Sequence, residues 1–244
     1  MHPIIVIPAR LAATRLPDKP LADIGGVPMI VRVLRQAEAA DVGPVVVAAG
    51  DRAIVEAVEA AGGRAVLTDP ALPSGTDRVR EALYAVDPDA AHDVVVNLQG
   101  DMPFVSPQVI RGAVQLFADR PRLQMGTLIA PEASPSDRSN PDVVKAIVSL
   151  ARGATQGRCL YFTRSTLWGE GPVWKHVGIY GYRREGLERM MAPPSPLELR
   201  EKLEQLRALE LGMDIWAAVV DETPISVDNA EDLEAARRYA RAHP

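Results

Sequence analysis

Residues 4–20 read IIVIPARLAATRLPDKP, and they set the expectation for the rest of the chain. The β-branched run at 4–7 is typical of a buried strand, and the more polar stretch after it predicts a loop that carries several cations. In an open α/β sheet, ligands bind beyond the carboxyl ends of the strands. The chemistry of this protein is therefore expected in the loop directly after Ile7.

Short apolar runs alternate with amphipathic stretches through the first half of the chain. This rhythm predicts βαβ units and a mostly parallel central sheet flanked by helices. The run VVVNL at 94–98 is apolar on both faces, as a central parallel strand should be. The other strands are expected at residues 4–7, 45–49 and 65–67, and the helices at residues 29–40, 52–61 and 76–86.

The second half changes character, because strands follow one another there without a helix between each pair. This pattern predicts a smaller antiparallel extension of the sheet. The strands are expected at residues 125–130, 144–150, 158–163, 177–183 and 215–220, and the helices at residues 197–211 and 230–241. Leu199, Leu203 and Leu206 form the apolar stripe of the first helix. The spacing of Asn229 and Asp232 predicts a capping box at the start of the second.

The composition is that of an ordinary globular protein. Of 244 residues, 47% are hydrophobic and 24% are charged, and 27 basic against 32 acidic residues give a net charge of -5. This balance argues against a nucleic-acid binder. No window approaches the ~20 apolar residues of a membrane helix, and the N-terminus lacks the features of a signal peptide. A single cysteine, Cys159, cannot form an internal disulfide, so the cytoplasm is the expected location.

Three cations, Arg10, Arg15 and Lys19, lie within ten residues of the loop after the first strand. Neither a Walker A loop nor a Rossmann glycine fingerprint is present, so side chains rather than backbone amides would carry most of any phosphate charge. An arginine offers a planar fork to two phosphate oxygens, and a lysine offers a movable point charge. The loop therefore predicts a polyphosphate ligand, and spacing alone leaves an ordinary solvated loop as the alternative.

Two aspartates are candidates for binding a divalent cation. Asp101 comes just after the strand at 94–98, which is expected to place it at the carboxyl edge of the sheet beside the first loop. Asp228 precedes the capping pair of the last helix, and its structural alternative is a favourable charge near a helix N-terminus, worth about 0.3 to 1 kcal/mol. Mg²⁺ takes few protein carboxylates and completes its octahedron with water and substrate phosphates, so one or two aspartates suffice.

Several motifs, taken together and in order, resemble those of one family. They are IIVIPARLAATRLPDKPLADIGGVPMIVRVL at 4–34, PSGTDRV at 73–79, VVNLQGDMP at 95–103, NPDVVKA at 140–146, YFTRS at 161–165, HVGIYGYR at 176–183, PSPLE at 194–198, LEQLR at 203–207 and VDNAEDL at 227–233. Over essentially its whole length the chain resembles the nucleotide-sugar cytidylyltransferases that activate 3-deoxy-D-manno-oct-2-ulosonate (KDO), the CMP-KDO synthetases. The resemblance implies an α/β, Rossmann-like nucleotidyltransferase fold in a single domain.

The resemblance also implies how the chain is divided. Residues 1–120 would be the CTP-binding α/β half, and residues 227–244 the C-terminal helix. Residues 121–226 would bind the sugar and form a homodimer, largely through strands around residues 158–182. CTP and KDO are the expected small-molecule substrates, and Mg²⁺ is the expected cofactor.

The family motifs assign roles to individual residues. The expected CTP-binding residues are Pro8, Ala9, Arg10, Arg15, Lys19, Ser74, Arg78 and Gln99. The expected KDO-binding residues are Gln99, Arg164, His176, Tyr180, Glu204 and Gln205. The expected catalytic residues are Arg10, Lys19, Asp101 and Asp228, and the two aspartates match the family's magnesium ligands. Selectivity for cytosine is expected at Ser74 and Arg78, although Ser74 could serve only as a helix cap.

The residues assigned to the sugar also have structural alternatives. His176 could be an ordinary histidine at a strand edge, and either Tyr180 or Tyr182 could belong to the core. Glu204 and Gln205 lie off the leucine stripe of their helix, as solvent-facing residues also would. Spacing alone selects none of them, so these assignments depend on the motif match.

The sequence departs from the family pattern in one loop of the first half. Residues 48–51 read AAGD, where many members carry a Thr-Asp pair after the second strand. A nucleotide contact from this loop is therefore left open.

The implied reaction is an in-line attack of the KDO anomeric hydroxyl on the α-phosphorus of CTP, which yields CMP-KDO and pyrophosphate for lipopolysaccharide biosynthesis. Two alternatives stay open, a CMP-sialate synthetase and a catalytically silent nucleotide-sugar binding protein. The YFTRS and GIYGY motifs favour KDO. The intact cation loop and both aspartates argue against a silent protein.

Overall fold

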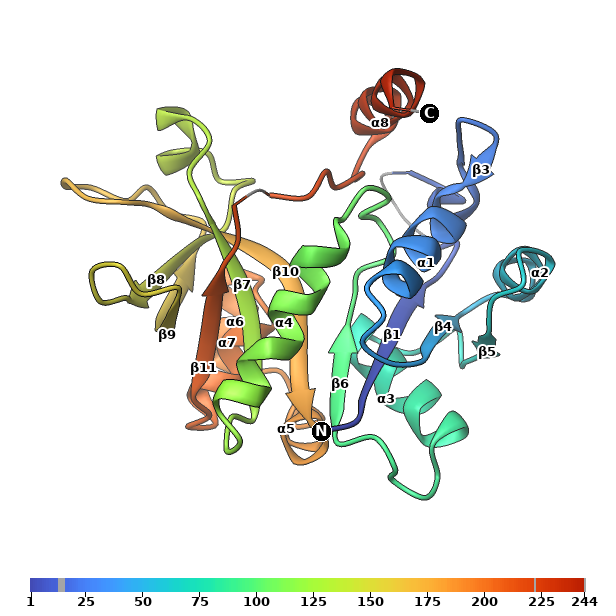
Figure 1. The fold of residues 1–244 in the computed structure, drawn as a ribbon. Coiled ribbons are helices and arrows are strands. Elements are labelled where there is room, and N and C mark those ends of the chain that lie inside the picture. Colours follow the sequence, from blue (N-terminus) through green and yellow to red (C-terminus); the bar gives the residue numbers. More distant parts are fainter. Residues whose placement is uncertain (13–15, 222, 244) are drawn as a thin grey trace. The chain divides into compact units, whose positions relative to one another are not determined.

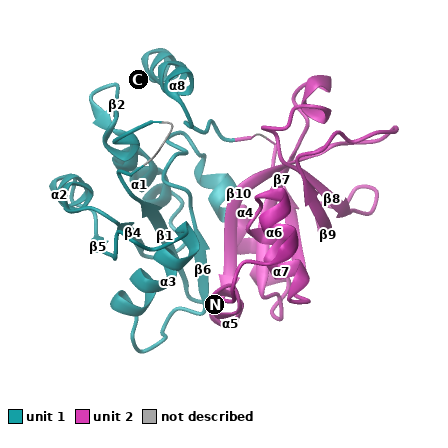
Figure 2. Cartoon of the chain, turned by 180° about the vertical axis from the view of Figure 1, so that it is seen from behind, with its two compact units in different colours: residues 1–111, 224–244 teal, residues 112–223 magenta. Residues whose placement is uncertain are grey.

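The structure is a computed structural model that describes residues 1–12, 16–221 and 223–243 (Figure 1). These residues form two compact units, Met1–Arg111 with Pro224–Pro244, and Gly112–Thr223 (Figure 2). Both ends of the chain therefore belong to the first unit. In the described part of the chain, none of the helices combines the length and the apolar composition needed to span a bilayer.

The first unit contains a parallel sheet in the order β5 (Ala65–Leu67), β4 (Val45–Ala49), β1 (Pro3–Ala9) and β6 (Val94–Asn97). The predicted strands and their parallel arrangement are confirmed. The β-branched side chains at 4–7 are at most 1% exposed, as expected for a strand covered on both faces. Because β1 and β6 are neighbours that run in the same direction, the loops after them leave the sheet at one edge.

Three predicted helices of this unit are confirmed as α1 (Met29–Ala39), α2 (Arg52–Ala60) and α3 (Gly75–Val86). The buried face of α1 contains the residues that its spacing predicts, Ile30, Val33, Leu34 and Ala37. Burying a large aliphatic side chain contributes about 1.5 to 3 kcal/mol, so this face is sufficient to hold α1 against β1 and β4.

The C-terminal helix α8 (Ala230–Ala242) also belongs to the first unit. The side chain of Asn229 accepts from the Asp232 amide, and Asp232 accepts from the Asn229 amide, so the predicted capping box is confirmed. α8 packs on a hairpin formed by β2 (Asp23–Ile24) and β3 (Val27–Pro28). The apolar cluster at this contact consists of Ile24, Met29, Val227, Leu233, Ala236 and Ala240.

The second unit contains a mostly antiparallel sheet, as predicted for the second half. Its strands are β7 (Met125–Pro131), β8 (Lys145–Ser149), β9 (Gln156–Thr163), β10 (Trp174–Arg183) and β11 (Ile215–Val219). The pairs β10 with β7, β11 with β9 and β9 with β8 are antiparallel, whereas β11 and β7 are parallel. β10 also pairs with β8 through Trp174 and Lys175, so the strands of this unit curl until these two meet. The predicted bounds differ from the observed ones by a few residues at most.

Two α-helices lie outside the predicted set, α4 (Pro107–Asp119) and α5 (Arg184–Arg189), as do the short 3-10 helices Lys19–Leu21 and Pro135–Arg138. The buried apolar side chains of α4 repeat at helical spacing and are Val109, Ile110, Ala113, Val114, Leu116 and Phe117. Gly181 on β10 accommodates the ring of Phe117, because a Cβ atom at that glycine would lie 2.3 Å from Phe117 Cε2. The close packing of this contact thus requires glycine on the strand.

The prediction of one helix at 197–211 is wrong. Two short helices occur there, α6 (Pro196–Glu201) and α7 (Gln205–Glu210), and Lys202 between them has a left-handed φ of 56°. The expected stripe does not lie on one face, because Leu199 is 66% exposed whereas Leu203 and Leu206 are buried. A left-handed residue ends a helix, so the chain turns at Lys202 and starts a new helix after it.

Candidate active site

A cavity of about 370 Å³ opens in the first unit at the carboxyl edge of its parallel sheet. The loops after β1 and β6 and the start of α3 converge on it. Its lining residues are Pro8, Ala9, Arg10, Ala12, Leu16, Lys19, Pro20, Ser74, Gly75, Arg78, Gln99, Gly100, Asp101 and Asp228. The structure thus brings together all the described residues predicted to bind CTP and both predicted metal ligands. Arg15 lies outside the described residues.

Lys19 makes the central polar contacts of this cavity. It begins a short 3-10 helix, Lys19–Leu21, and its Nζ atom donates to Asp101 Oδ2 and to the Val227 carbonyl, each at 2.8 Å. The same atom lies 3.8 Å from Asp228 Oδ1. The backbones are joined as well, since the Val227 amide donates to the Asp101 carbonyl at 2.9 Å. One ammonium group therefore links two aspartates that are far apart in the sequence.

The two aspartates fit a divalent cation that needs few protein ligands. Their side chains are 23% and 45% exposed, so neither carboxylate is sealed in the core. Among the described residues, no group of three or more His, Cys, Asp or Glu side chains is arranged to hold a metal. Asp101 and Asp228 already share one cation, Lys19, and water and substrate phosphates would complete the coordination of Mg²⁺. The pair therefore suits Mg²⁺ better than a metal that needs a closed protein cage.

Arg78 lies deep beside the cavity and is firmly held. The residue is 2% exposed, and its Nη1 atom donates to Thr68 Oγ1 and to the Asp69 carbonyl. Its Nη2 atom is buried without a hydrogen-bond partner among the described residues. Burial lowers the pKa of Arg78, and the charge of Arg10 lowers it further. A desolvated guanidinium with a spare donor attracts an anionic or carbonyl oxygen.

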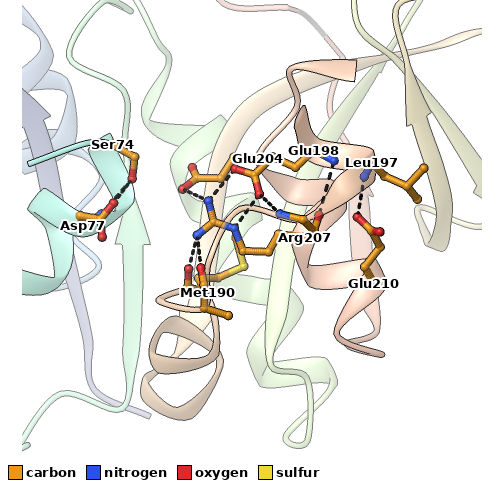
Figure 3. Close-up of polar contacts among 10 residues, drawn as sticks. Ser74, Asp77, Met190, Leu197, Glu198, Glu204, Arg207 and Glu210 are labelled. Atoms are coloured by element: carbon orange, nitrogen blue, oxygen red, sulfur yellow. Dashed lines mark hydrogen bonds and ion pairs between the residues drawn. The ribbon is translucent and has the colours of Figure 1, made fainter. Parts of the chain in front are cut away.

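Ser74 is the N-cap of α3, so its hydroxyl does serve as a helix cap, the alternative that the sequence left open. Its Oγ atom accepts from the Asp77 amide at 3.1 Å and donates to Asp77 Oδ2 at 2.6 Å (Figure 3). A contact from this hydroxyl to cytosine would have to compete with the cap. Gln99, in the loop after β6, donates from Nε2 to Asn97 Oδ1 at 3.1 Å.

In the second unit, His176 and Tyr180 lie next to each other on β10, with ring centroids 5.4 Å apart. Thr127 on β7 holds the histidine, because its Oγ1 atom lies 3.0 Å from His176 Nε2 and also donates to the Ile179 carbonyl at 2.9 Å. Burial lowers the pKa of His176 to about 3. The ring is therefore neutral at pH 7 and acts as a hydrogen-bonding group rather than a charge.

Gln205 joins this cluster from α7. The Tyr180 hydroxyl donates to Gln205 Oε1 at 3.2 Å, and Gln205 is only 3% exposed, so it does not face solvent. Its Nε2 atom is buried with no partner among the described residues, which leaves a donor for a ligand oxygen. Burial raises the pKa of Tyr180, and the charge of Glu204 raises it further. Tyr182, at 1% exposed, is a core residue.

Arg207 fixes the turn that carries Glu204 (Figure 3). Its guanidinium makes a two-point contact with Glu198, at 2.7 Å from Nε to Oε2 and 2.5 Å from Nη2 to Oε1. It also donates to the carbonyls of Met190 and Ala192 and lies 3.8 Å from Glu204 Oε1. The start of α7 is thereby tied to α6 and to the segment before it.

Arg164 follows the end of β9 and binds a different set of groups. Its Nη1 atom donates to the Pro141 carbonyl at 3.0 Å, and its own carbonyl accepts from Lys145 Nζ at 2.8 Å. Of the residues predicted to bind the sugar, the structure joins His176, Tyr180 and Gln205 by direct contacts.

The sequence analysis did not identify three groups that hydrogen-bond to predicted site residues, namely the side chains of Thr127 and Lys145 and the carbonyl of Val227. Thr127 and Lys145 are both 0% exposed, and a polar residue inside an apolar strand was the available signal for each. The carbonyl of Val227 had no such signal, because it contributes backbone only.

Comparisons with known proteins gave consistent matches. A family profile described as cytidylyltransferase matches residues 4–215. A 3-deoxy-manno-octulosonate cytidylyltransferase from Rhodospirillum centenum is 60% identical over 238 residues, which cover 97% of this chain and 92% of that protein. The protein of the same name from Parvibaculum lavamentivorans is 57% identical with the same coverage.

Solved structures agree with this match. A CMP:2-keto-3-deoxy-manno-octonic acid synthetase complexed with CTP has a TM-score of 0.90 at 36% identity, with 100% of both chains covered. A 4-diphosphocytidyl-2C-methyl-D-erythritol synthase from Anaerococcus prevotii has a TM-score of 0.67 at 12% identity, covers 98% of both chains, and shares the fold alone. The α/β nucleotidyltransferase fold expected from the sequence is confirmed.

Proposed function

Because the chain belongs to the family of 3-deoxy-manno-octulosonate cytidylyltransferases, we propose that it transfers CMP from CTP to KDO and releases pyrophosphate. The observation that carries this conclusion is 60% identity over 97% of the chain to a protein of that name. The product, CMP-KDO, would serve lipopolysaccharide biosynthesis. The relatives reported above lend no support to CMP-sialate synthesis or to a silent binding protein.

In this reaction the anomeric hydroxyl of KDO forms a bond to the α-phosphorus of CTP. The bond from that phosphorus to the oxygen shared with the β-phosphate breaks, and the hydroxyl proton is lost to water. Phosphoryl-type transfer leaves the protein mainly positioning and charge stabilisation. Arg10 and Lys19, which line the cavity, would neutralise the charge that develops on pyrophosphate.

Asp101 and Asp228 are the proposed ligands of Mg²⁺. A bound Mg²⁺ would neutralise phosphate charge and lower the pKa of the attacking hydroxyl. The contacts of both carboxylates with Lys19 support this assignment, because they define a position where the chain stabilises positive charge.

The sugar would be held by hydroxyl-binding groups and by one cation. The neutral ring of His176, the Tyr180 hydroxyl and the buried amide of Gln205 suit sugar hydroxyls. Arg164 suits the carboxylate of KDO, because a guanidinium forms strong paired hydrogen bonds with it. Gln99 and Glu204 complete the proposed set on the family motif alone.

A homodimer formed around residues 158–182, in the cytoplasm, is also proposed. Leu160 and Trp168 in that segment are 51% and 90% exposed, and removing their apolar surface from water would favour association. Cys159 is buried and unpaired, so the chain needs no oxidising compartment. Light scattering after size-exclusion chromatography tests the dimer, and a monomeric mass at micromolar concentration would reject it.

Pyrophosphate release from CTP in the presence of KDO and Mg²⁺ tests the proposed function. We expect release to depend on all three and to fall at least about tenfold when sialate replaces KDO. Asp101→Asn should lower kcat about 100-fold or more with an unchanged circular dichroism spectrum, because it keeps the shape and loses the charge. Asp23→Asn, in the hairpin outside the cavity lining, is the control and should retain activity. Wild-type protein that releases no pyrophosphate with KDO would reject the proposal.

A further inference from the structure

The loop after β4 holds the backbone around Arg10 from both sides. The Gly50 amide donates to the Ala9 carbonyl at 2.8 Å, and the Leu11 amide donates to Asp51 Oδ2 at 2.8 Å. These hydrogen bonds reach the two peptide groups that flank the Arg10 Cα atom. Because each peptide group is planar, both contacts together fix the direction in which the side chain of Arg10 starts.

The carboxylate of Asp51 binds the Leu11 amide although Asp51 occupies the N-cap position of α2. It precedes α2 with an extended backbone, a position from which an aspartate usually accepts from amides of its own helix. Its side chain caps no amide of α2, and its carboxylate instead reaches Leu11, 40 positions earlier in the chain. The contact is therefore not a by-product of helix formation.

Gly50 leaves the space in which Arg10 and Arg78 approach each other. A Cβ atom at this position would lie 2.8 Å from Arg78 Nη1 and 3.1 Å from Arg10 Cβ. Gly50 is not among the glycines with positive φ, so its backbone does not demand glycine and the requirement is one of space. Arg78 cannot easily move aside, because Thr68 and Asp69 bind its Nη1 atom.

Arg10 and Arg78 both line the cavity and approach each other at Gly50, so two positive charges lie in one corner of it. The charge of Arg10 lowers the pKa of Arg78 beyond the effect of burial, while the carboxylates of Asp51, Glu81 and Asp69 act in the opposite direction. The spare Nη2 donor of Arg78 has no partner among the described residues. This corner is therefore suited to an electron-rich oxygen of a ligand.

We propose that Gly50 and Asp51 are positioning residues that set the affinity of the cavity for CTP, an inference that rests on the proposed function for the identity of the ligand. Asp51 fixes the backbone from which Arg10 extends, and Gly50 leaves room for Arg78. The two guanidinium groups are thus arranged before the nucleotide arrives, which lowers the entropy lost on binding. The AAGD loop, which departs from the family pattern, acts through these arginines.

Calorimetric titration with CTP in the absence of KDO tests this proposal separately from turnover. Asp51→Ala should raise the Kd for CTP about tenfold or more, because a charge-assisted hydrogen bond beside Arg10 is lost. Asp51→Asn should stay within about threefold of wild type, since its amide oxygen accepts from the same Leu11 amide. Asp87→Ala is the matched control, because the Asp87 carboxylate, like that of Asp51, accepts from backbone amides of the first unit, here those of Ala91 and His92, which lie outside the cavity lining. It should lower the Tm and leave the Kd within about twofold.

Gly50→Ala tests the second half of the proposal in two backgrounds. It should raise the Kd for CTP about tenfold in wild type and at most about threefold in Arg78→Ala, because the displaced group is already absent there. A Kd for Asp51→Ala equal to wild type, or an equal rise for Asp51→Ala and Asp87→Ala, would overturn the proposal. If Asp51→Ala fails to fold, a wild-type Kd for Gly50→Ala overturns it. Wild-type protein that does not bind CTP would reject the proposed function instead.

Discussion

Replacing Arg207 with methionine should destabilise the second unit far more than the loss of an exposed ion pair. The side chains of Arg207 and Glu198 are 7% and 13% exposed, and two hydrogen bonds of 2.7 and 2.5 Å join them (Figure 3). Methionine keeps much of the length of the side chain and removes the guanidinium. Glu198 therefore stays in a poorly solvated position without its charged partner.

The burial of Arg207 and Glu198 sets the expected loss in the free energy of unfolding. Removing one partner of a buried pair costs about 3 to 5 kcal/mol, because the remaining charge is left uncompensated. The carbonyls of Met190 and Ala192 lose a donor in the same variant. Some solvent reaches Glu198, so we expect the lower end, a loss of about 3 kcal/mol in the free energy of unfolding. For a protein of this size that corresponds to a fall of about 6 to 12 °C in Tm.

Urea unfolding followed by circular dichroism at pH 7 measures this loss, and Arg158→Met is the matched control. Arg158 lies 2.7 Å from Asp214, but their side chains are 56% and 61% exposed, so removing this pair should cost less than about 1 kcal/mol. Arg207→Lys keeps the charge without the planar fork and should fall between the two. Equal destabilisation by Arg207→Met and Arg158→Met would refute the reasoning.

The pH dependence gives a second readout of the same pair. Burial raises the pKa of Glu198, but hydrogen bonds from Arg207 and the Ser195 amide, with the charge of Arg207, bring it below its ordinary value of 4.5. A carboxyl group with a depressed folded pKa stabilises the fold above its unfolded pKa and loses that contribution as the pH falls through the folded value. The difference between wild type and Arg207→Met should therefore shrink as the pH falls from 7 to below 4.5.

Other buried groups give further predictions. Between pH 7.5 and 5.5 the free energy of unfolding should fall about 1 kcal/mol more in wild type than in His176→Phe, because the unfolded histidine takes up a proton near pH 6.5 while burial holds the folded pKa at about 3. Urea unfolding at both pH values measures this, and parallel losses would contradict it. Gly181→Ala should cost about 1 to 3 kcal/mol in the same assay, since the new Cβ would overlap Phe117; wild-type stability would mean that the ring repacks freely. Cys159 should resist thiol reagents near pH 8 until urea unfolds the chain, because burial raises its pKa to about 12. Rapid labelling of the native protein would contradict that burial.

Elements decided by local patterns were predictable, and elements decided by tertiary contacts were not. The predicted face of α1, Ile30, Val33, Leu34 and Ala37, repeats at helical spacing, and all four residues are buried. The break between α6 and α7 depends on Lys202, whose left-handed backbone has no signature in residue propensity. Leu199 completed an apolar stripe in the sequence, yet it lies 66% exposed on α6.

In the candidate site, too, features set by local sequence patterns were predictable, whereas features set by tertiary contacts were not. Arg10 and Asp101 could be placed together because they follow β1 and β6, parallel neighbours whose carboxyl ends share an edge. The contact of Asp51 with Leu11 spans 40 residues, and no spacing rule relates the two. Thr127 supports His176 across a strand pair whose register shifts at a bulge, which the sequence does not reveal.

Through its contacts with Val227 and Asp228, Lys19 connects the segment before α8 to the cavity. Its bond to the Val227 carbonyl joins residues 208 positions apart, and its contact with Asp228 follows from that bond. Asp232 Oδ2, which caps α8, also accepts from the Asp228 amide at 2.9 Å. The carboxylate that begins the helix therefore also fixes the backbone of the aspartate that faces Lys19. A change that loosens the start of α8 must for this reason disturb the charge arrangement of the cavity as well as the stability of the first unit.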